Sequence, residues 1–339
     1  AIYLVLGGYF AVTMTDFIQG LLMLGGVFVL LYYVFASEPV GGLVTGINRL
    51  AAIDPRLVSP AGPNWWGLLS LVVLTSLGPW GLPQMVQKFY AIKDERSIRP
   101  ATIVSTIFAL VVATGAYFTG AFGRLFFDNQ MPLLNGSPNP DLIMPQIISQ
   151  YLPPWVGLLL LLLVLAASMS TLASLVLVSS SAVAIDVVQG SAPGLSRRPV
   201  VALMRFLCVC FIGLSVYIAL KPTIILVLMS LSWGTVAGAF LAPYLYGLYW
   251  RRTTKAGAWA GMLTGLLLSL GLSFYYNLDG NLIPTIGSLA MIIPLGVVPL
   301  VSLLTPAFSR EHLLKVFGSA DLSQVVTKEL ATEDLGYRK

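Results

Sequence analysis

Charged residues are scarce in this chain. Only 10% of its 339 residues are Asp, Glu, Lys or Arg, whereas 57% are hydrophobic and the mean hydropathy is +0.86. This composition excludes a soluble globular domain, because a folded soluble protein needs far more polar surface. It predicts an all-α polytopic membrane protein. The net charge of +5 follows from the placement of loops described below, so no nucleic-acid partner is expected.

Histidine, cysteine and phosphate-binding motifs are also nearly missing. The single histidine, His312, lies in the polar C-terminal region, which excludes a catalytic triad and argues against a histidine metal site within the membrane. Cys208 and Cys210 are two residues apart on a predicted helix, so they point to different faces and should not form a disulfide. The chain has no Walker-type loop and no predicted ATP motor. We predict that it is not an enzyme.

Long apolar segments, in contrast, are abundant. Eight of them are long enough to cross a bilayer, for which a helix needs about 20 residues. They run approximately over Thr15–Phe35, Trp65–Val86, Ala101–Phe122, Trp155–Val178, Val200–Leu220, Thr223–Trp250, Ala256–Tyr275 and Thr285–Leu304. Ala1–Tyr9 is apolar but too short to cross, and we interpret it as the tail of a helix that begins before this chain.

The distribution of Lys and Arg predicts how these spans are oriented. Most of the 19 basic residues lie in Gln87–Pro100, Ser179–Pro199, Arg251–Lys255 and the tail after Thr305. Because positively charged loops remain in the cytoplasm, we expect a multi-pass plasma (inner) membrane protein. Its predicted domains are a transmembrane domain over residues 1–305 and a cytoplasmic tail over residues 306–339.

Hydroxyl groups gather in the middle of the fourth span, where a bilayer is driest. Ser170 and Thr171 are adjacent, and Ser174 lies one turn beyond Ser170 on the same face. Polar groups at this depth usually face another helix, a cavity or an ion path, and Na⁺ prefers oxygen ligands. The cluster predicts a site for a hard cation such as Na⁺. In the alternative interpretation, the hydroxyls bond back to carbonyls of their own helix, or the small residues serve packing.

Asp16 lies at the predicted cytoplasmic start of the first complete span. It is either a helix N-terminal carboxylate stabilised by the helix dipole or a carboxylate that attracts or coordinates the cation on its way to the cytoplasm. The residues alone leave both interpretations open.

The second span carries two prolines and two glycines at membrane depth, in the segment from Thr75 to Gln84. Proline removes a backbone donor and clashes with the preceding turn, so we expect non-helical backbone between Gly78 and Pro83. Secondary transporters bind substrate or ions at such breaks; the alternative is a proline kink packed against its neighbours. The predicted substrate-binding residues are Thr75, Ser76, Gly78, Pro79, Trp80 and Gln84.

Four segments together resemble the sodium:solute symporter family, whose members cotransport proline, pantothenate, monocarboxylates, sialic acid or sugars. They are Gly7–Gly20, Gly81–Gln84 with Lys88–Ala91, Ala166–Thr171 with Ser179–Ser181, and Tyr246–Arg252 with Gly257, Ala258, Gly261 and Met262. The resemblance implies the inverted-repeat, leucine-transporter-like fold. In that register Ala1–Tyr9 ends the fourth core helix, Asp16 starts the fifth, and core helices one to three and most of four are missing.

The resemblance also implies ligands. The common sodium site would use the Ala167 carbonyl and the Ser170 and Thr171 hydroxyls. A second Na⁺ found in some relatives would correspond to Asp16, Ser170 and Ser174. Ala173 departs from that pattern because it has no side-chain oxygen, so we expect one Na⁺ per cycle.

The same resemblance narrows the transported solute. Thr75 and Pro79 stand where proline transporters place Trp and Tyr, which disfavours proline, and the segment Thr119–Arg124 is similar to the pantothenate-like branch. We expect Na⁺-coupled uptake of a small organic anion, such as pantothenate or a monocarboxylate, by alternating access. The alternative substrate class is an amino acid or a sugar, and the alternative function is a membrane sensor, which would need a separate signalling partner.

Overall fold

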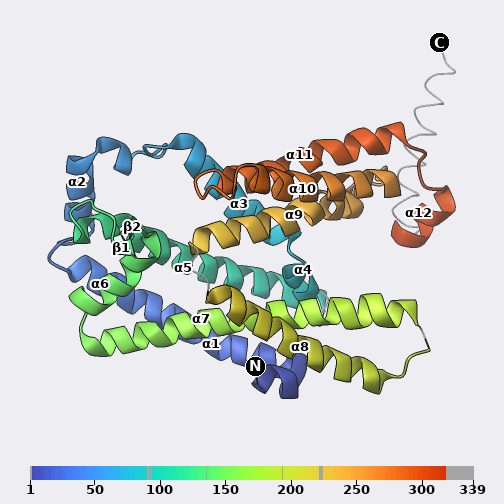
Figure 1. The fold of residues 1–339 in the computed structure, drawn as a ribbon, viewed down its shortest axis with the longest axis horizontal. Helices are drawn as coiled ribbons and strands as arrows, with labels where there is room; N and C mark the ends of the chain where they lie inside the picture. The colour runs from blue at the N-terminus through green and yellow to red at the C-terminus, as the bar shows by residue number, and fades with distance from the viewer. Residues whose placement is uncertain are drawn as a thin grey trace, which may run out of the picture. The chain divides into compact units, whose positions relative to one another are not determined.

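The computed structural model describes residues 2–89, 92, 94–134, 136–192, 194–220 and 224–317, with the backbone alone for residues 2–12, 87, 88 and 310. This part of the chain is almost entirely helical (Figure 1). In chain order its elements are α1 (Ile2–Ala36), α2 (Leu43–Ile53), η1 (Pro55–Val58), α3 (Trp65–Gly81), α4 (Pro83–Phe89), η2 (Glu95–Ser97), α5 (Ile98–Phe126), β1 (Leu133–Leu134), β2 (Ser137–Pro138), η3 (Pro140–Leu142), α6 (Ile143–Tyr151), α7 (Pro154–Ser181), η4 (Ala182–Gln189), α8 (Arg197–Ala219), α9 (Ile225–Tyr249), α10 (Lys255–Tyr275), α11 (Ile283–Leu304) and α12 (Arg310–Phe317).

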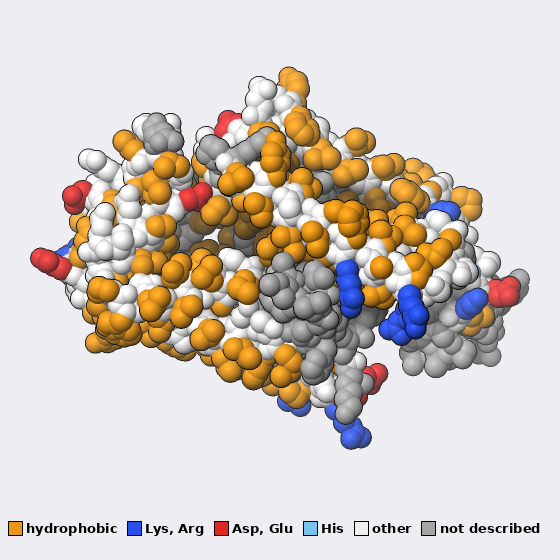
Figure 2. All heavy atoms as spheres, turned by 60° about the horizontal axis from the view of Figure 1, so that its bottom comes forward, with side chains coloured by type: hydrophobic (Ala, Val, Ile, Leu, Met, Phe, Trp, Pro, Cys, Tyr) orange, Lys and Arg blue, Asp and Glu red, His pale blue; other side chains and the backbone are white. Residues whose placement is uncertain are grey.

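Membrane-spanning helices dominate the structure. Among the described residues, seven helices are long and apolar enough to cross a bilayer. Each contains or overlaps one of the predicted spans, so those seven predictions are confirmed. Hydrophobic side chains also cover much of the face seen in Figure 2, as expected of a surface that contacts lipid instead of water. The multi-pass membrane class predicted from composition is therefore confirmed.

The eighth predicted span is interrupted, but over a shorter stretch than predicted. α3 has 17 residues and continues helically through Pro79 to Gly81, and α4 begins at Pro83. Only Leu82 lies between them, so the expectation of non-helical backbone from Gly78 to Pro83 was wrong for the other positions. A proline is well placed at the first position of a helix, and it restricts the residue before it. These preferences place the break at Leu82, before Pro83.

The first helix differs from the prediction as well. α1 begins at Ile2 and continues through Asp16 to Ala36. The predictions that Ala1–Tyr9 ends one core helix and that Asp16 starts the next were therefore wrong, and Asp16 is not a helix N-terminal residue. The glycine pair Gly7-Gly8 costs only about 1 kcal/mol per residue in a helix. That is too little to end a segment that contains no proline.

The described chain forms two compact units. The first comprises Ala1–Leu68 and Pro83–Leu228, and its central pair is α1 and α7, which lie side by side in opposite directions (Figure 1). The rings of Tyr33 and Trp155 are 5.6 Å apart near one end of this pair, and Gly26 lies directly against Leu163 further along. Buried apolar residues from α1, α5, α6 and α7 form the core at the Tyr33 end, including Leu30, Val34, Phe122, Phe126, Ile147, Val156 and Leu160.

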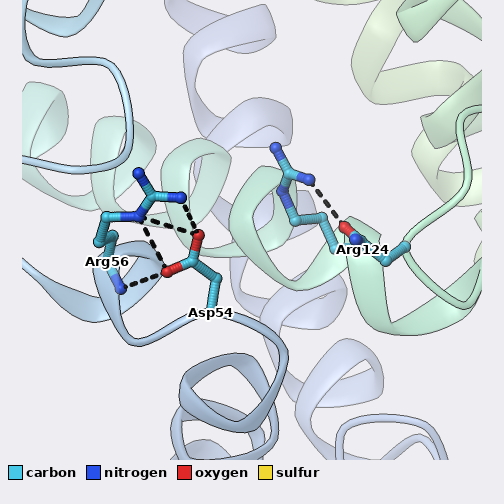
Figure 3. A network of polar contacts seen from close by, with 4 residues as sticks. Asp54, Arg56 and Arg124 are labelled. Carbon is cyan, nitrogen blue, oxygen red and sulfur yellow. Dashed lines mark hydrogen bonds and ion pairs between the residues drawn. The ribbon is translucent and has the colours of Figure 1, made fainter.

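Loops of this first unit are held by local polar contacts (Figure 3). Arg56 forms an ion pair with Asp54 at 2.8 Å, and Arg124 Nη1 donates a hydrogen bond of 2.8 Å to Asn129 Oδ1. The side-chain hydrogen bond from Arg56 holds the pKa of Asp54 below its ordinary value. A short antiparallel hairpin follows, in which β1 and β2 pair Leu133 with Pro138 and Leu134 with Ser137.

The second unit comprises Leu69–Leu82 and Met229–Lys339. Its helices approach one another closely because small residues line the contacts. The buried face of α10 carries a small residue at every fourth position: Gly257, Gly261, Gly265, Ser269 and Ser273. A Cβ atom at Gly234 of α9 would lie 2.6 Å from the Cα of Gly287 on α11. The hydroxyls of Thr235 and Ser269 are hydrogen-bonded at 2.8 Å, which links α9 to α10.

Candidate functional site

Two predicted site residues from distant parts of the sequence meet in the first unit. Ser170 Oγ on α7 donates a hydrogen bond of 2.7 Å to Asp16 Oδ1 on α1. Both side chains are half-buried. A hydrogen bond to a carboxylate is among the stronger kinds in proteins, and within a membrane-spanning pair of helices it fixes both side chains at one depth. The contact places a negative charge beside the hydroxyl cluster predicted to bind Na⁺.

The bond made by Ser170 differs from that made by neighbouring hydroxyls. Ser180 and Ser181 on the same helix donate to the carbonyls of Val176 and Val178, as serine often does within helices. Thr75 on α3 likewise donates to the Leu71 carbonyl. Back-bonding was the alternative interpretation of the Ser170 cluster, and for Ser170 it is wrong.

The other residues of the predicted sodium site occupy different environments on α7. Ala167 and Ser174 are half-buried, like Ser170, whereas Thr171 is exposed. Thr171 follows Ser170 directly and so lies about 100° further round the helix. Ala173 is buried with Val176 and Cys208 in a small cluster between α7 and α8. Among the predicted ligands, Asp16 and Ser170 are the pair that the structure describes as joined by a hydrogen bond.

Gln19 is a further residue of this region that the sequence analysis did not single out. It lies three residues after Asp16 on α1, is only 6% exposed, and its Oε1 has no hydrogen-bond partner among the described residues. Because residues three apart share a helix face, Gln19 is on the side of α1 that faces α7. A buried acceptor without a partner is costly. An oxygen-binding cation would satisfy it, so the residues present fit a Na⁺ site. The signal in the sequence was an amide one turn from a carboxylate within an apolar span.

The predicted substrate segment has a mixed environment. In the second unit Gly78 is buried against Trp233, where an added Cβ would lie 2.9 Å from the ring, and Gly81 packs against Ala237 in the same way. Pro79 and Thr75 are half-buried. Ser76 and Trp80 are exposed, the latter by 60%. Gln84 is half-buried at the start of α4 and belongs to the first unit. A shared substrate site formed by these residues stays a prediction.

A multi-pass helical chain with an interrupted span and a carboxylate–hydroxyl pair inside the membrane is typical of the secondary-transporter class. Sequence comparison agrees and is more specific. The chain belongs to the sodium:solute symporter family, whose sequence model matches residues 1–265.

Individual relatives point to two branches of that family. The chain is 30% identical over 288 residues to a sodium/pantothenate symporter of Haemophilus influenzae, covering 81% of this chain and 57% of that protein. It is 32% identical over 273 residues to a sodium/proline symporter of the same organism, covering 78% of this chain and 53% of that protein. The chain therefore spans little more than half the length of these relatives.

A solved structure supports the fold. The chain is similar to a Na⁺-coupled sialic acid symporter in a substrate-bound outward-open state, with a TM-score of 0.62 and 19% identity, over 91% of this chain and 65% of that one. The leucine-transporter-like fold expected from the resemblance is thereby confirmed.

Proposed function

We propose that the protein couples Na⁺ influx to the uptake of a small organic anion by alternating access in the plasma (inner) membrane. The observation that carries this proposal is the Ser170–Asp16 hydrogen bond, which sets a carboxylate next to the hydroxyl cluster between two membrane-spanning helices. Family membership and the Na⁺-coupled structural neighbour support it. ATP and nucleic acid have no part in this mechanism. Its partners are the solute and the lipid bilayer.

The proposed Na⁺ ligands are the Ala167 carbonyl and the hydroxyls of Ser170 and Thr171. Asp16 and Ser174 form an ion path or a second position towards the cytoplasm. We add Gln19 Oε1 to this set because it is buried and has no partner among the residues that the structure describes. All of these are oxygen donors, as a hard cation requires. The buried methyl group of Ala173 offers no ligand, which supports a cycle with one Na⁺.

The proposed substrate residues are Thr75, Ser76, Gly78, Pro79, Trp80 and Gln84, around the break at Leu82. A sodium/pantothenate symporter among the relatives supports an organic anion. The presence of proline symporters among them keeps an amino acid as the alternative class, although Thr75 and Pro79 differ from the Trp and Tyr expected for proline.

We further propose that residues 1–305 form the transmembrane domain and that residues 306–339 form a cytoplasmic tail. The basic residues Arg251, Arg252 and Lys255 support this orientation. The structure describes α12 within the tail; residues 318–339 lie outside the described part.

The test of sodium coupling is solute uptake into proteoliposomes with and without an inward Na⁺ gradient. We expect accumulation only with the gradient. The double variant Ser170→Ala/Thr171→Ala should need at least about tenfold more Na⁺ for half-maximal uptake, since each lost ligand to a charged group is worth about 1.5–3 kcal/mol. Ser181→Ala is the matched control, because that hydroxyl bonds to its own helix.

Equal accumulation with and without the gradient would contradict the proposal, as would an unchanged Na⁺ requirement in the double variant. A membrane sensor would bind the solute in a Na⁺-dependent way but would not accumulate it, so the same assay distinguishes the two functions.

A further inference from the structure

A cavity outside the proposed transport site lies at one end of the second unit. Its volume is about 360 Å³, within the range of small-molecule pockets. The walls come from the end of α9, the start of α10 and the amphipathic helix α12. Figure 1 shows α12 beside the ends of these helices.

This cavity lies at the membrane surface. α9 ends at Tyr249 and α10 begins at Lys255, and both helices are long and apolar enough to cross the bilayer, so the turn between them lies at the boundary of the hydrocarbon layer. Two hydrogen bonds join this turn to the residue that follows α11. The Thr254 and Thr305 hydroxyls are hydrogen-bonded at 2.7 Å, and Arg252 Nη2 donates to the Thr305 carbonyl at 2.9 Å. The end of α11 therefore lies at the same membrane depth as the cavity wall.

The lining combines basic and apolar side chains. Arg251, Lys255 and His312 line the cavity, and none of the described residues that line it is acidic. Glu311 is the neighbouring acid on α12, and it does not line the cavity. The apolar part includes Trp250, Phe308 and Leu313. Arg251 lies over the ring of Phe317 at 5.7 Å, and the rings of Phe308 and His312 are stacked at 4.6 Å. The Arg251–Phe317 contact joins α12 to the turn between α9 and α10, whereas Phe308 stacks on His312 within the segment that contains α12 itself.

Such a lining matches one kind of ligand. Arg and Lys bind phosphate oxygens through charge-assisted hydrogen bonds, and the amphipathic ring of Trp at a membrane interface sits at the level of the headgroups. A soluble anion would use the basic part of the lining and leave the apolar part without a role. An amphiphile with an anionic head uses both. We propose that the cavity binds the phosphate headgroup of an anionic phospholipid in the cytoplasmic leaflet. This proposal depends on the orientation proposed above, but not on the identity of the transported solute.

The test compares lipids bound to the purified protein by native mass spectrometry. The protein is equilibrated with micelles that contain phosphatidylglycerol, phosphatidylcholine or an equal mixture. Phosphatidylglycerol should be retained in preference to phosphatidylcholine. In Arg251→Gln/Lys255→Gln, retention of phosphatidylglycerol should fall by about tenfold to thirtyfold, because each basic group near a lipid surface contributes about 1 kcal/mol. Retention of phosphatidylcholine should not change.

Arg197→Gln/Arg198→Gln is the matched control, since it removes the same charge from exposed positions at the start of α8. It should retain phosphatidylglycerol as the unaltered protein does. Lys255→Glu serves as a second variant, because Lys255 is exposed and its replacement should not impair folding; it too should lower retention of phosphatidylglycerol.

Three results would overturn the lipid proposal. The first is equal retention of the two lipids by the unaltered protein. The second is an equal loss in the control variant, which would mean that only surface charge matters. The third is displacement of phosphatidylglycerol by millimolar inorganic phosphate, which would assign the cavity to a soluble anion. Uptake is not measured in this experiment, so its failure leaves the proposed transport function unaffected.

Discussion

At the scale of single residues, the hydrogen bond between Ser170 and Asp16 has the clearest functional meaning. It joins positions 154 residues apart, with a donor–acceptor distance of 2.7 Å. The Ser170 hydroxyl therefore does not donate to a backbone carbonyl of α7. Serine in an apolar helix usually has its own helix as partner. A cross-helix bond to a carboxylate requires both segments to be held at matching depth, which the antiparallel packing of α1 and α7 provides.

Gln19 gives a prediction that separates a ligand from a packing residue. Replacing it with Leu removes a buried acceptor that has no hydrogen-bond partner in the described part of the chain. In Na⁺-free buffer the Gln19→Leu protein should therefore be as stable as the unaltered protein or more stable, since an unsatisfied buried polar group costs about 1–3 kcal/mol. Its stabilisation by Na⁺, measured as the shift in Tm on adding NaCl in place of choline chloride, should shrink.

The matched control for this variant is Gln146→Leu, which changes a half-buried glutamine on α6 in the same unit. It should retain the full Na⁺-dependent shift in Tm. If Gln19→Leu also retained the full shift, Gln19 would have no role in Na⁺ binding.

Asp54 and Arg56 provide a prediction that depends on pH. The Arg56 side chain lowers the pKa of Asp54 in the folded protein, so the pair contributes stability above the unfolded pKa of about 3.9. That contribution is lost as the pH falls through the lower folded value. Asp54→Asn removes the charge but keeps an oxygen that can accept from the Arg56 backbone N–H.

Hydrogen exchange of the amides in residues 56–59, corrected for intrinsic rates, measures this effect. At pH 7 the unaltered protein should be better protected than Asp54→Asn, and the difference should shrink as the pH falls below the unfolded pKa of about 3.9. A difference that grows on acidification would show that the ion pair is not its cause.

At the scale of elements, two helices show how local composition directs packing. α3 continues through Pro79, and the interruption falls at Leu82. Gly78 and Gly81 let Trp233 and Ala237 approach this part of the helix closely. Leu82 is also where the chain passes from the second unit to the first. In α10, small residues at every fourth position make one face flat, so the backbones of neighbouring helices can approach it closely.

Replacing Gly265 with Leu tests the packing of α10. A side chain there would meet the backbone of Gly238 on α9, which cannot move aside as a side chain can. We expect the protein to lose about 3 kcal/mol or more of stability, as in overpacked cores, measured as a lowered Tm in detergent. Gly271→Leu on the same helix is the control, because nothing lies within 4 Å of its added Cβ. Equal effects of the two variants would contradict this account of the contact.

At the scale of the whole molecule, the number of Na⁺ ions in the proposed transport cycle would determine how the membrane potential acts on uptake. With one Na⁺ and a monovalent anion the transported charges cancel, so an imposed potential should leave accumulation of the anion unchanged. A second Na⁺, or a neutral solute, would leave one net charge to cross the membrane. Each net charge gains about 2.3 kcal/mol per 100 mV, or roughly fifty-fold accumulation.

Proteoliposomes with a fixed Na⁺ gradient and a potassium diffusion potential set by valinomycin measure this dependence. Pantothenate is the first solute to test, and valinomycin without a potassium gradient is the control. A fifty-fold rise in accumulation of the anion at 100 mV would contradict the one-Na⁺ cycle and support a second ion near Asp16.

The class and most spans of this protein were determined by the sequence alone, because burial in lipid demands long apolar helices whatever their arrangement. The same reasoning predicted Asp16 and Ser170, since polar groups are conspicuous in such segments. Their partners were not predictable. Three findings depend on which helices pack together: that Ser170 bonds to Asp16 and not to its own helix, where α3 ends, and that Gln19 Oε1 is buried without a hydrogen-bond partner among the described residues. Those contacts join residues far apart in the chain, so only the tertiary structure decided them.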